Sequence, residues 1–437
     1  MTVLTTSSTT QLTVKAITLG CKVNQYESQA LLELFKNEGY RETTGEADVV
    51  IVNTCAVTSE GERKSRQAAR RILRDEPFAR VILCGCAVQR SPESMAIPGV
   101  TLTTGTANRL RVVELLSQAI REGHAISDVS TIDDDAYEPL SVSSSADGRV
   151  RASLKIEDGC EYRCAYCVIP SVRGKVRSRG IESIRSEAAL LAESSYREIS
   201  LVGINLSAYG TDLADGRLDN RIDLADAIIA ASDAARSARI RISSLEPTLI
   251  TPAFIDKLKR VNNLCEHFPL ALQSGCDATL ARMRRRYNTA TFANAVRLLR
   301  QAFPGCAITT DIIAGFPGET DEEFSRTVDF VKEIGFSRIH VFPYSKRDGT
   351  AAAGFPNQVS EHIKKERAKR LTLVGNESAE AFISRMIEAS VLFEEAENGG
   401  VSGYSREYTR VFVPNAPADL IGAVRKVRLD GSGAVIL

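Results

Sequence analysis

The stretch Asp158-Gly-Cys160-Glu-Tyr-Arg-Cys164-Ala-Tyr-Cys167-Val-Ile-Pro170 is the most informative part of this chain. Its cysteines follow the spacing C-x3-C-x2-C. Three thiolates are one short of the four that complete a 4Fe–4S cluster, so a cluster bound here would keep one iron open. A structural zinc site takes a fourth protein ligand, and no His or Cys follows closely behind Cys167. The spacing therefore favours an iron–sulfur cluster over a zinc site or buried structural cysteines.

The composition limits the classes of protein to which the chain can belong. Its 437 residues are enough for two or three domains. Lys+Arg and Asp+Glu both number 55, so nucleic-acid binding would rest on local patches. Ten cysteines in a chain of this length fit cytosolic metal binding better than a secreted disulfide scaffold. Without a signal-peptide pattern or an apolar run of roughly 20 residues, we expect a soluble, cytoplasmic protein with no membrane partner.

The region 13–123 alternates short apolar runs with helical patterns. Asn24 stands where the first helix is expected to begin, and Glu27, three residues on, fits a capping-box partner. Alternating strands and helices predict a parallel α/β sheet, in which ligands gather beyond the carboxyl ends of the strands. The strands are expected at 14–19, 48–53 and 80–85, and a further helix at 62–73.

Three cysteines of this region, Cys21, Cys55 and Cys86, stand at the expected strand ends. They lie about one strand–helix unit apart in the sequence and could meet in space. The alternative is that they are three small buried residues, since free cysteine is often buried. Cys84 belongs to the third strand itself, so we expect it in the core, but it could take the place of Cys86.

The central region, 148–377, contains six apolar runs separated by helix-length segments. This pattern predicts a partial (βα)6 barrel of the TIM type, opened on one side, whose chemistry lies at the carboxyl ends of the strands. The cysteine stretch follows the first of these strands and is therefore expected at the active face. Segment 124–147, with its acidic residues, serines and a proline, is predicted to be a linker. The strands are expected at 152–156, 198–202, 239–243, 268–272, 307–313 and 338–342.

The C-terminal region, 380–437, contains five short alternating runs punctuated by Gly and Pro. Five strands in so short a region predict a small, OB-like β-barrel. The runs lie at 391–393, 401–404, 409–413, 423–427 and 434–436.

The three groups of motifs together resemble the radical-SAM methylthiotransferase family. Thr18-Leu-Gly-Cys21, Asn53-Thr-Cys55-Ala-Val-Thr58 and Gly85-Cys86 look like the cysteine motifs of its N-terminal domain, and Cys160 to Cys167 resembles the radical-SAM signature. The small C-terminal barrel resembles a TRAM domain, an RNA-binding module. The resemblance implies S-adenosylmethionine (SAM) and two 4Fe–4S clusters, one held by Cys21, Cys55 and Cys86, the other by Cys160, Cys164 and Cys167.

The same resemblance suggests which residues contact SAM. Gly203 and Asn205 are expected near its amino group, and Ser243, Glu246 and Gln273 near its ribose or carboxylate. Gly315 and Phe342 are expected near its adenine.

Basic stretches are the candidates for RNA contact. The alternative for them is a solvated protein surface, and for the C-terminal barrel it is a structural cap. Cys265, Cys276 and Cys306 match no ligand spacing and are expected to be packing residues. The candidate RNA contacts are Lys64, Arg66, Arg70, Arg71 and Arg74; Arg173, Lys175, Arg177 and Arg179; Arg282 to Tyr287; and Arg406, Tyr408, Arg410, Arg425, Lys426 and Arg428.

The family resemblance implies a reaction. One SAM methylates a sulfur held at the first cluster, and a second SAM yields a radical that activates an unreactive carbon for methylthio transfer. The segments Lys22–Glu27 and His340–Arg347 look most like the branch that acts on N6-threonylcarbamoyladenosine at position 37 of tRNA, modifying its C2. The implied partners are the tRNA anticodon loop, an electron donor such as a flavodoxin or ferredoxin, and a sulfur source.

Three other functions are weighed against this one. Two are methylthiotransferases, acting on N6-isopentenyladenosine-37 of tRNA or on a ribosomal-protein aspartate. The third is a non-enzymatic iron–sulfur sensor that binds RNA.

Overall fold

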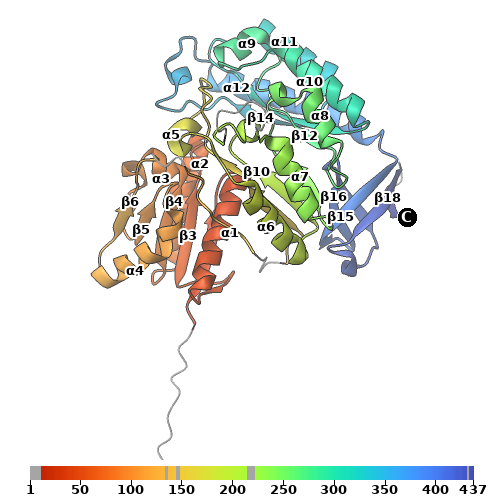
Figure 1. The fold of residues 1–437 in the computed structure, drawn as a ribbon. Helices are drawn as coiled ribbons and strands as arrows, with labels where there is room; N and C mark the ends of the chain where they lie inside the picture. The colour runs from red at the N-terminus through yellow and green to blue at the C-terminus, as the bar shows by residue number, and fades with distance from the viewer. Residues whose placement is uncertain (1–10, 133–135, 144–147, 214–221, 431–432) are drawn as a thin grey trace, which may run out of the picture. The chain divides into compact units, whose positions relative to one another are not determined.

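The computed structural model describes residues 11–132, 136–143, 148–213, 222–430 and 433–437, drawn as a ribbon in Figure 1. These residues form two compact units. The first contains 11–132, Glu138–Val142 and the short segment Ser171–Arg173. The second contains the remaining described residues, which include the central region and the C-terminal region.

The first unit is built on a parallel sheet of six strands. Their order is β2-β1-β3-β4-β5-β6, and every neighbouring pair is parallel, which confirms the parallel α/β prediction. β3 is buried along its whole length, as is usual for a strand covered on both faces. The strands are β1 (Thr13–Thr18), β2 (Arg41–Glu42), β3 (Val49–Thr54), β4 (Arg80–Gly85), β5 (Leu102–Thr104) and β6 (Ile126–Asp128).

Helices α1 and α4 share a hydrophobic core with one face of this sheet. Leu31 and Phe35 of α1 are fully buried in the same cluster as Ile51 and Leu115. Each such side chain stabilises the fold by roughly 1.5–3 kcal/mol relative to exposure. The helices of this unit are α1 (Lys22–Asn37), α2 (Ser59–Asp75), α3 (Cys86–Arg90) and α4 (Val112–Glu122).

Two expectations about this unit are wrong. Helix α1 begins at Lys22 with Cys21 in the N-cap position, because the side chain of Asn24 binds backbone oxygens elsewhere instead of capping the helix. Segment 124–147 is not a linker throughout, since Ile126–Asp128 forms the edge strand β6. A three-residue strand is too short to show a period of two in the sequence.

The second unit contains six parallel strands in chain order. β7, β10 and β11 form one three-stranded sheet, and β12, β13 and β14 form another. Parallel bridges Ile240↔Leu264 and Leu245↔Leu270 connect the two sheets, so the six strands make the partial barrel that the sequence predicts. The strands are β7 (Arg151–Lys155), β10 (Glu198–Val202), β11 (Arg239–Ile242), β12 (His267–Pro269), β13 (Ala307–Ala314) and β14 (Arg338–Pro343).

Helices connect the barrel strands and lie outside them in Figure 1. Two short strands, β8 (Glu157–Asp158) and β9 (Arg177–Ser178), pair antiparallel on either side of the cysteine stretch. This pair is not foreseen from the sequence. The helices are α5 (Ile169–Arg173), α6 (Ile181–Glu193), α7 (Leu224–Ala234), α8 (Pro252–Leu258), α9 (Asp277–Arg282), α10 (Thr289–Ala302), α11 (Asp321–Ile334) and α12 (Glu361–Ile383).

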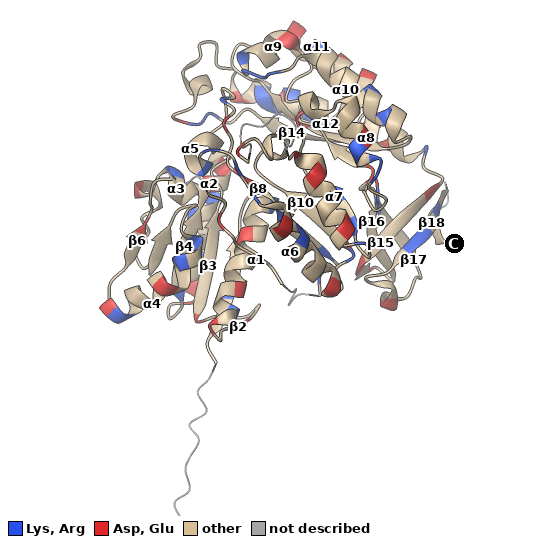
Figure 2. Ribbon diagram, in the orientation of Figure 1, with Lys and Arg blue, Asp and Glu red and all other residues tan. Residues whose placement is uncertain are grey.

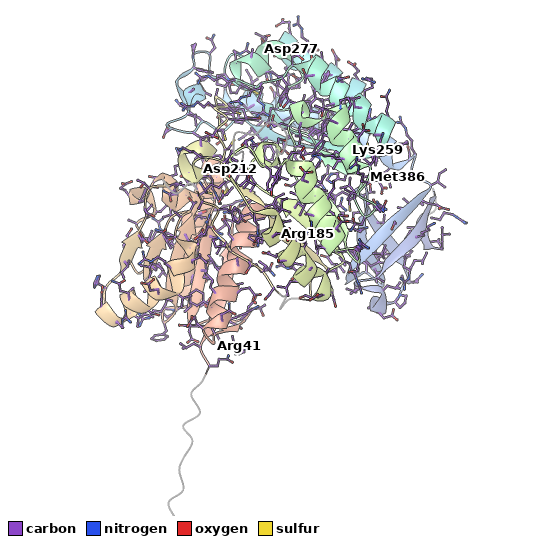
Figure 3. The ribbon with its side chains drawn as sticks, viewed as in Figure 1. Arg41, Arg185, Asp212, Lys259, Asp277 and Met386 are labelled. Carbon is purple, nitrogen blue, oxygen red and sulfur yellow. The ribbon has the colours of Figure 1, made fainter. Side chains whose placement is uncertain are left out.

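The C-terminal region forms the predicted small barrel. Its antiparallel strands are ordered β17-β16-β15-β18-β19, and β17 also contacts β19, so the sheet nearly closes. The expected boundary between 377 and 380 is wrong, because α12 continues to Ile383 without a break. Met386, labelled in Figure 3, follows this helix and packs against the barrel core. The strands are β15 (Glu388–Glu397), β16 (Gly400–Ser405), β17 (Arg410–Pro414), β18 (Val424–Asp430) and β19 (Gly433–Ile436).

A buried ionic cluster joins the C-terminal barrel to the central strands. Glu198 of β10 pairs with Arg241 at 2.7 Å and with Arg239 at 2.7 Å. Arg241 also donates to the carbonyl oxygens of Ser405 and Arg406 at 3.1 and 3.0 Å. Burial raises the pKa of Glu198, but the two guanidinium groups outweigh it and hold the pKa at about 2.

We expect Glu198→Gln to destabilise the protein at pH 7 by about 3–5 kcal/mol, because it leaves two buried guanidinium groups without their carboxylate. The pKa of Glu198 is lowered on folding, so its stabilising effect is present above pH ~4.5 and is lost as the pH falls towards 2. Urea unfolding of the wild type and the variant across this range measures both effects. Glu182→Gln, which alters an exposed carboxylate on α6, is the control, and an equal loss there would contradict the prediction.

Charges of both signs are interspersed over the helices in Figure 2, consistent with the formal net charge of zero. Among the described helices, none is both long and apolar enough to cross a membrane.

Candidate iron–sulfur and SAM sites

A buried network of amide and hydroxyl groups holds the cysteine loops of the first unit. The Asn24 side chain donates to the carbonyl oxygens of Leu19 and Thr54 at 3.0 and 2.9 Å. Asn53 donates to the Asn24 carbonyl at 3.1 Å, and the Thr54 hydroxyl donates to the Cys84 carbonyl at 2.7 Å. These bonds tie the ends of β1, β3 and β4 together, so that the loops bearing the cysteines start from one sheet edge.

The structure brings Cys21, Cys55 and Cys86 to this edge, and none of the three forms a disulfide. A Cβ added to Gly20 would lie 3.2 Å from the Cys55 Cβ, which shows how closely the first two loops approach. Cys21 is exposed, Cys55 is half-buried and Cys86 is buried, where burial raises the pKa of its thiol to about 11. Three cysteine thiols at one sheet edge fit a cluster with an open iron.

Cys84 lies in a different environment from Cys86. Its side chain belongs to the hydrophobic cluster under α1 and α4, with Leu31 and Phe35. Burial there raises the pKa of its thiol to about 12. The structure thus places Cys84 in the core, where the sequence analysis expects it.

Arg173 and Arg241 are the largest fully buried side chains of the described residues, and Arg173 contacts residues of the first unit. It pairs with Glu27, which also pairs with Arg109 at 2.8 Å. Its Nε donates to the Cys86 Sγ at 3.3 Å. Glu27, which the sequence analysis reads as a capping residue, is therefore the carboxylate that holds two arginines beside the cysteine loops.

We expect Gly85→Ala to disturb the first cysteine set. Gly85 has φ +98°, and an added Cβ would lie 2.3 Å from Asn53 Oδ1, inside the network that holds the loops. A loss of about 2–3 kcal/mol of stability is expected, together with a reduced iron content after anaerobic reconstitution. Gly39→Ala is a matched control, because Gly39 also has a positive φ of +87° but nothing within 4 Å of the added carbon. Equal iron contents in the two variants would contradict this account.

In the second unit, Cys160, Cys164 and Cys167 line one cavity of about 130 Å³. All three are unpaired thiols, and burial raises the pKa of Cys160 to about 11 and that of Cys167 to about 12. The cavity contains polar groups of the kinds that SAM needs. Its other lining residues are Tyr162, Tyr166, Ile169, Ile204, Asn205, Ser244, Leu245, Glu246, Ala271 and Arg285.

The backbone of the cysteine loop is fixed at several points. The N–H of Cys160 donates to the Gly174 carbonyl at 3.0 Å, and that of Cys167 to the Cys164 carbonyl at 3.1 Å. Gly159 has φ +86°, and a Cβ there would meet the Lys175 carbonyl oxygen at 1.7 Å, so only glycine fits. Asp212, labelled in Figure 3, accepts from the Ser178 N–H at 2.7 Å and so supports β9 beside the loop.

Two predicted SAM contacts line this cavity. Asn205 donates from its Nδ2 to the Cys160 Sγ at 3.6 Å, and Glu246 pairs with Arg285 across the cavity wall. Gly203 adjoins them, and a Cβ there would lie 2.6 Å from the Glu157 carboxylate. The position of Gly203 therefore requires a residue without a side chain.

Four other predicted SAM contacts are not among the residues that line the cavity. Ser244, one residue after Ser243, lines it instead, and the Gln273 backbone pairs with β13. A Cβ on Gly315 would meet Lys364 of α12, and Phe342 lies 46% exposed on β14. A one-residue shift at a strand end moves a side chain to the opposite face, which a motif alone does not reveal.

The sequence does not reveal Glu157, and it indicates Arg285 only as a candidate RNA contact. Glu157 is fully buried, accepts from the Asn205 N–H at 2.7 Å, and has its pKa raised to about 8 by burial. Arg285 donates to the Cys164 Sγ at 3.1 Å. The only sequence feature that could indicate Glu157 is its closeness to Cys160. Arg285 lies within a run of arginines, and nothing in the sequence distinguishes it from its neighbours.

Many of the residues predicted to contact RNA instead form ion pairs, hydrogen bonds or ring contacts within the protein. Arg406 donates to the Leu264 carbonyl, and Tyr408 stacks on His267 with centroids 5.0 Å apart, so both attach the C-terminal barrel to the central strands. Lys64, Arg70, Arg71 and Arg74 of α2 remain exposed, and their contact with RNA stays a prediction. The engaged residues of the other stretches are Arg173 with Glu27, Arg177 with Asp158, Arg179 with Glu187, Arg282 with Glu323, and Arg286 over Tyr162.

Within the described residues, no three His, Cys, Asp or Glu side chains converge on a point that would hold a single metal ion. A 4Fe–4S cube binds each cysteine through a different iron, so its ligands surround a larger volume.

Comparison with known proteins agrees with this geometry. Residues 154–331 match the radical SAM superfamily, and residues 13–102 match a family described as uncharacterized protein family UPF0004. Among solved structures, the radical S-adenosylmethionine methyltransferase TsrM from Kitasatospora setae is similar in fold. Its TM-score is 0.57 at 14% identity, covering 89% of this chain and 79% of that one.

Curated relatives align over nearly the whole chain. The threonylcarbamoyladenosine tRNA methylthiotransferase MtaB of Bacillus subtilis is 41% identical over 439 residues, covering 96% of this chain and 94% of that protein. The Thermotoga maritima protein of the same name is 35% identical, covering 97% and 96%. The tRNA-2-methylthio-N(6)-dimethylallyladenosine synthase of Clostridium tetani is 35% identical, covering 83% and 81%. The chain therefore belongs to the radical-SAM methylthiotransferase family, in the branch of the threonylcarbamoyladenosine tRNA methylthiotransferases.

Proposed function

We propose that this protein inserts a methylthio group at C2 of N6-threonylcarbamoyladenosine at position 37 of tRNA. The observation that carries the proposal is the presence of two separate sets of three cysteines outside any disulfide, one in each compact unit. The relatives with the threonylcarbamoyladenosine name align over nearly the full length of both chains, which favours this substrate over the isopentenyl one. The cofactors are SAM and 4Fe–4S clusters, and we assign one cluster to each cysteine set.

The second cysteine set is the proposed site of SAM cleavage. When bound there, a reduced cluster supplies the electron that splits SAM into methionine and a 5′-deoxyadenosyl radical. Cys160, Cys164 and Cys167 hold the cluster at the cavity, and Asn205 and Glu246 supply polar groups for the SAM amino acid and ribose. A hydrophobic cluster that includes Ala165 and Phe316 packs against Tyr166 and so supports the cysteine loop.

The first cysteine set is the proposed site of the transferred sulfur. Cys21 and Cys55 are accessible enough to meet a small sulfur donor, whereas Cys86 anchors the set from the core. The carbon at C2 has no acidic proton, so general acid–base groups have nothing to act on there. The side chains of this set therefore serve to bind and orient.

The proposed partners follow from this reaction. They are a tRNA, whose anticodon loop presents unpaired bases that a protein can draw out and stack, a flavodoxin or ferredoxin as electron donor, and a sulfur source. Since tRNA is the substrate, we propose a cytoplasmic location.

Mass spectrometry of tRNA nucleosides from a deletion strain tests the substrate. We expect 2-methylthio-N6-threonylcarbamoyladenosine to disappear and its unmethylthiolated precursor to accumulate, with recovery on complementation. Loss of the methylthio-isopentenyl nucleoside instead would overturn the substrate assignment. Loss of ribosomal methylthio-aspartate with unchanged tRNA would assign the protein substrate, and no loss in either would favour the RNA-binding sensor.

A further inference from the structure

Each cysteine set has a buried arginine that donates to one of its thiols. In the first unit, Arg173 Nε lies 3.3 Å from Cys86 Sγ. In the second unit, Arg285 Nη1 lies 3.1 Å from Cys164 Sγ. The arginines belong to different parts of the sequence and to different compact units, so the two contacts are independent observations.

A glutamate holds each arginine in place. The Arg173 side chain is 0% exposed and binds both oxygens of Glu27, which is 1% exposed. The Arg285 side chain is 5% exposed and binds both oxygens of Glu246, which is 13% exposed. In Arg173 the two bonds come from Nη1 and Nη2, and such a fork fixes the plane of a guanidinium and leaves its Nε directed elsewhere. In Arg285 Nη2 alone contacts both oxygens, which leaves its Nε and Nη1 directed elsewhere. Here one of those N–H groups points at a thiol.

The neighbouring side chains fix Arg285 further. Its Nε donates to the Tyr287 hydroxyl at 3.0 Å, and its guanidinium carbon lies 4.8 Å from the centre of that ring. Tyr287 in turn donates to the Leu272 carbonyl at 3.1 Å. The guanidinium is thus fixed by a chain of bonds from the barrel and has no freedom to reach a phosphate in solution.

We propose that Arg173 and Arg285 are positioning residues that each donate to a cluster-ligating thiolate and raise the reduction potential of that cluster. The proposal rests on the proposed function, because it takes the two cysteine sets as cluster ligands. The potential of an iron–sulfur cluster depends on its net charge, its burial and the hydrogen bonds to its sulfurs. A fixed cation that donates to a ligand sulfur favours the reduced cluster, which carries one more negative charge.

The test for Arg285 isolates the second cluster in the full-length chain. The Cys21→Ala/Cys55→Ala/Cys86→Ala background is reconstituted anaerobically without SAM, and the cluster is titrated with a reductant and followed by electron paramagnetic resonance. Arg285→Met is expected to shift the reduction equilibrium at least tenfold towards the oxidised form, which is ~59 mV for a one-electron couple. Arg285→Lys, which keeps the charge but loses the planar guanidinium, is expected to shift the reduction equilibrium less.

Arg284→Met is the matched control, since it removes an exposed arginine beside Arg285 that makes none of these contacts with the cysteine loop. A midpoint for Arg285→Met equal to that of Arg284→Met, in protein with normal iron content, would overturn the proposal. Should Arg285→Met fail to load iron, a midpoint for Arg285→Lys equal to that of the parent would overturn it as well. A parent background that itself binds no iron would instead overturn the proposed function.

The test for Arg173 uses the opposite background, Cys160→Ala/Cys164→Ala/Cys167→Ala. Arg173→Lys is the first variant, because loss of charge beside buried Glu27 would destabilise the unit. Lys175→Met, which alters an exposed lysine two residues on, is the control. A midpoint potential that is lower in Arg173→Lys and unchanged in Lys175→Met supports the proposal. Equal midpoints in Arg173→Lys and Lys175→Met would overturn the proposal for this cluster.

Discussion

Replacing Cys164 by alanine is expected to reduce the release of 5′-deoxyadenosine from SAM to the level of iron-free protein. Cys164 is one of three thiols that line the cavity of the second unit, and it accepts a hydrogen bond from Arg285. Its loss removes a cluster ligand and leaves Arg285 without its sulfur acceptor. A cluster with two cysteine ligands does not persist, and iron should fall from about eight to about four per chain. The measurement is chromatography of 5′-deoxyadenosine after chemical reduction of reconstituted protein, with iron determined on the same sample.

Cys276→Ala is the control for this experiment, because Cys276 is buried in the same unit but does not line the cavity. It should retain its iron and its nucleoside release. Release of 5′-deoxyadenosine by Cys164→Ala at the rate of the Cys276→Ala protein would contradict the assignment of the second cysteine set.

Replacing Cys86 by alanine is expected to abolish methylthio transfer while leaving 5′-deoxyadenosine release intact. Cys86 lies at the end of β4, where its thiol receives the Arg173 hydrogen bond. Its loss should again lower the iron content from about eight to about four per chain, this time from the first set. Mössbauer spectroscopy and iron analysis, with assays of both products, separate the two functions.

Cys84→Ala gives the decisive comparison, since the two cysteines are separated by one residue. The Cys84 side chain packs in the hydrophobic core, so its truncation should cost about 1 kcal/mol of stability and leave the iron content unchanged. Loss of iron from Cys84→Ala, with normal iron in Cys86→Ala, would show that the wrong neighbour has been assigned.

The sequence is sufficient to predict the longer buried strands of this protein. The runs at 48–53 and 198–202 differ by at most one residue from β3 and β10. Both are short apolar runs with β-branched residues, and a run of this length favours a strand over a helix. The cysteine loops are predicted for the same reason, since each follows a strand whose end is clear. Short edge strands such as β6 carry too few residues to show any period.

Polar residues are predicted less well, because their roles depend on partners that are distant in the sequence. Asn24 and Glu27 have the spacing of a capping box, yet Asn24 binds Thr54 and Glu27 binds Arg109 and Arg173. A spacing of three residues predicts a bond between neighbours on one helix. It cannot predict that Glu27 pairs with arginines more than eighty residues away. The arginine stretches show the same effect, since a buried ion pair and a phosphate-binding surface require the same residue types.

The attachment of the C-terminal barrel has a practical consequence. Arg239 donates to the Ser390 and Tyr404 carbonyls, and Arg406 donates back to Leu264, so this barrel supplies hydrogen-bond acceptors for arginines that lie within the central strands. Cutting the chain after α12 would leave those guanidinium groups without these acceptors. Such a shortened protein would lose stability in its central strands. A loss of activity would therefore not show that the C-terminal barrel binds RNA.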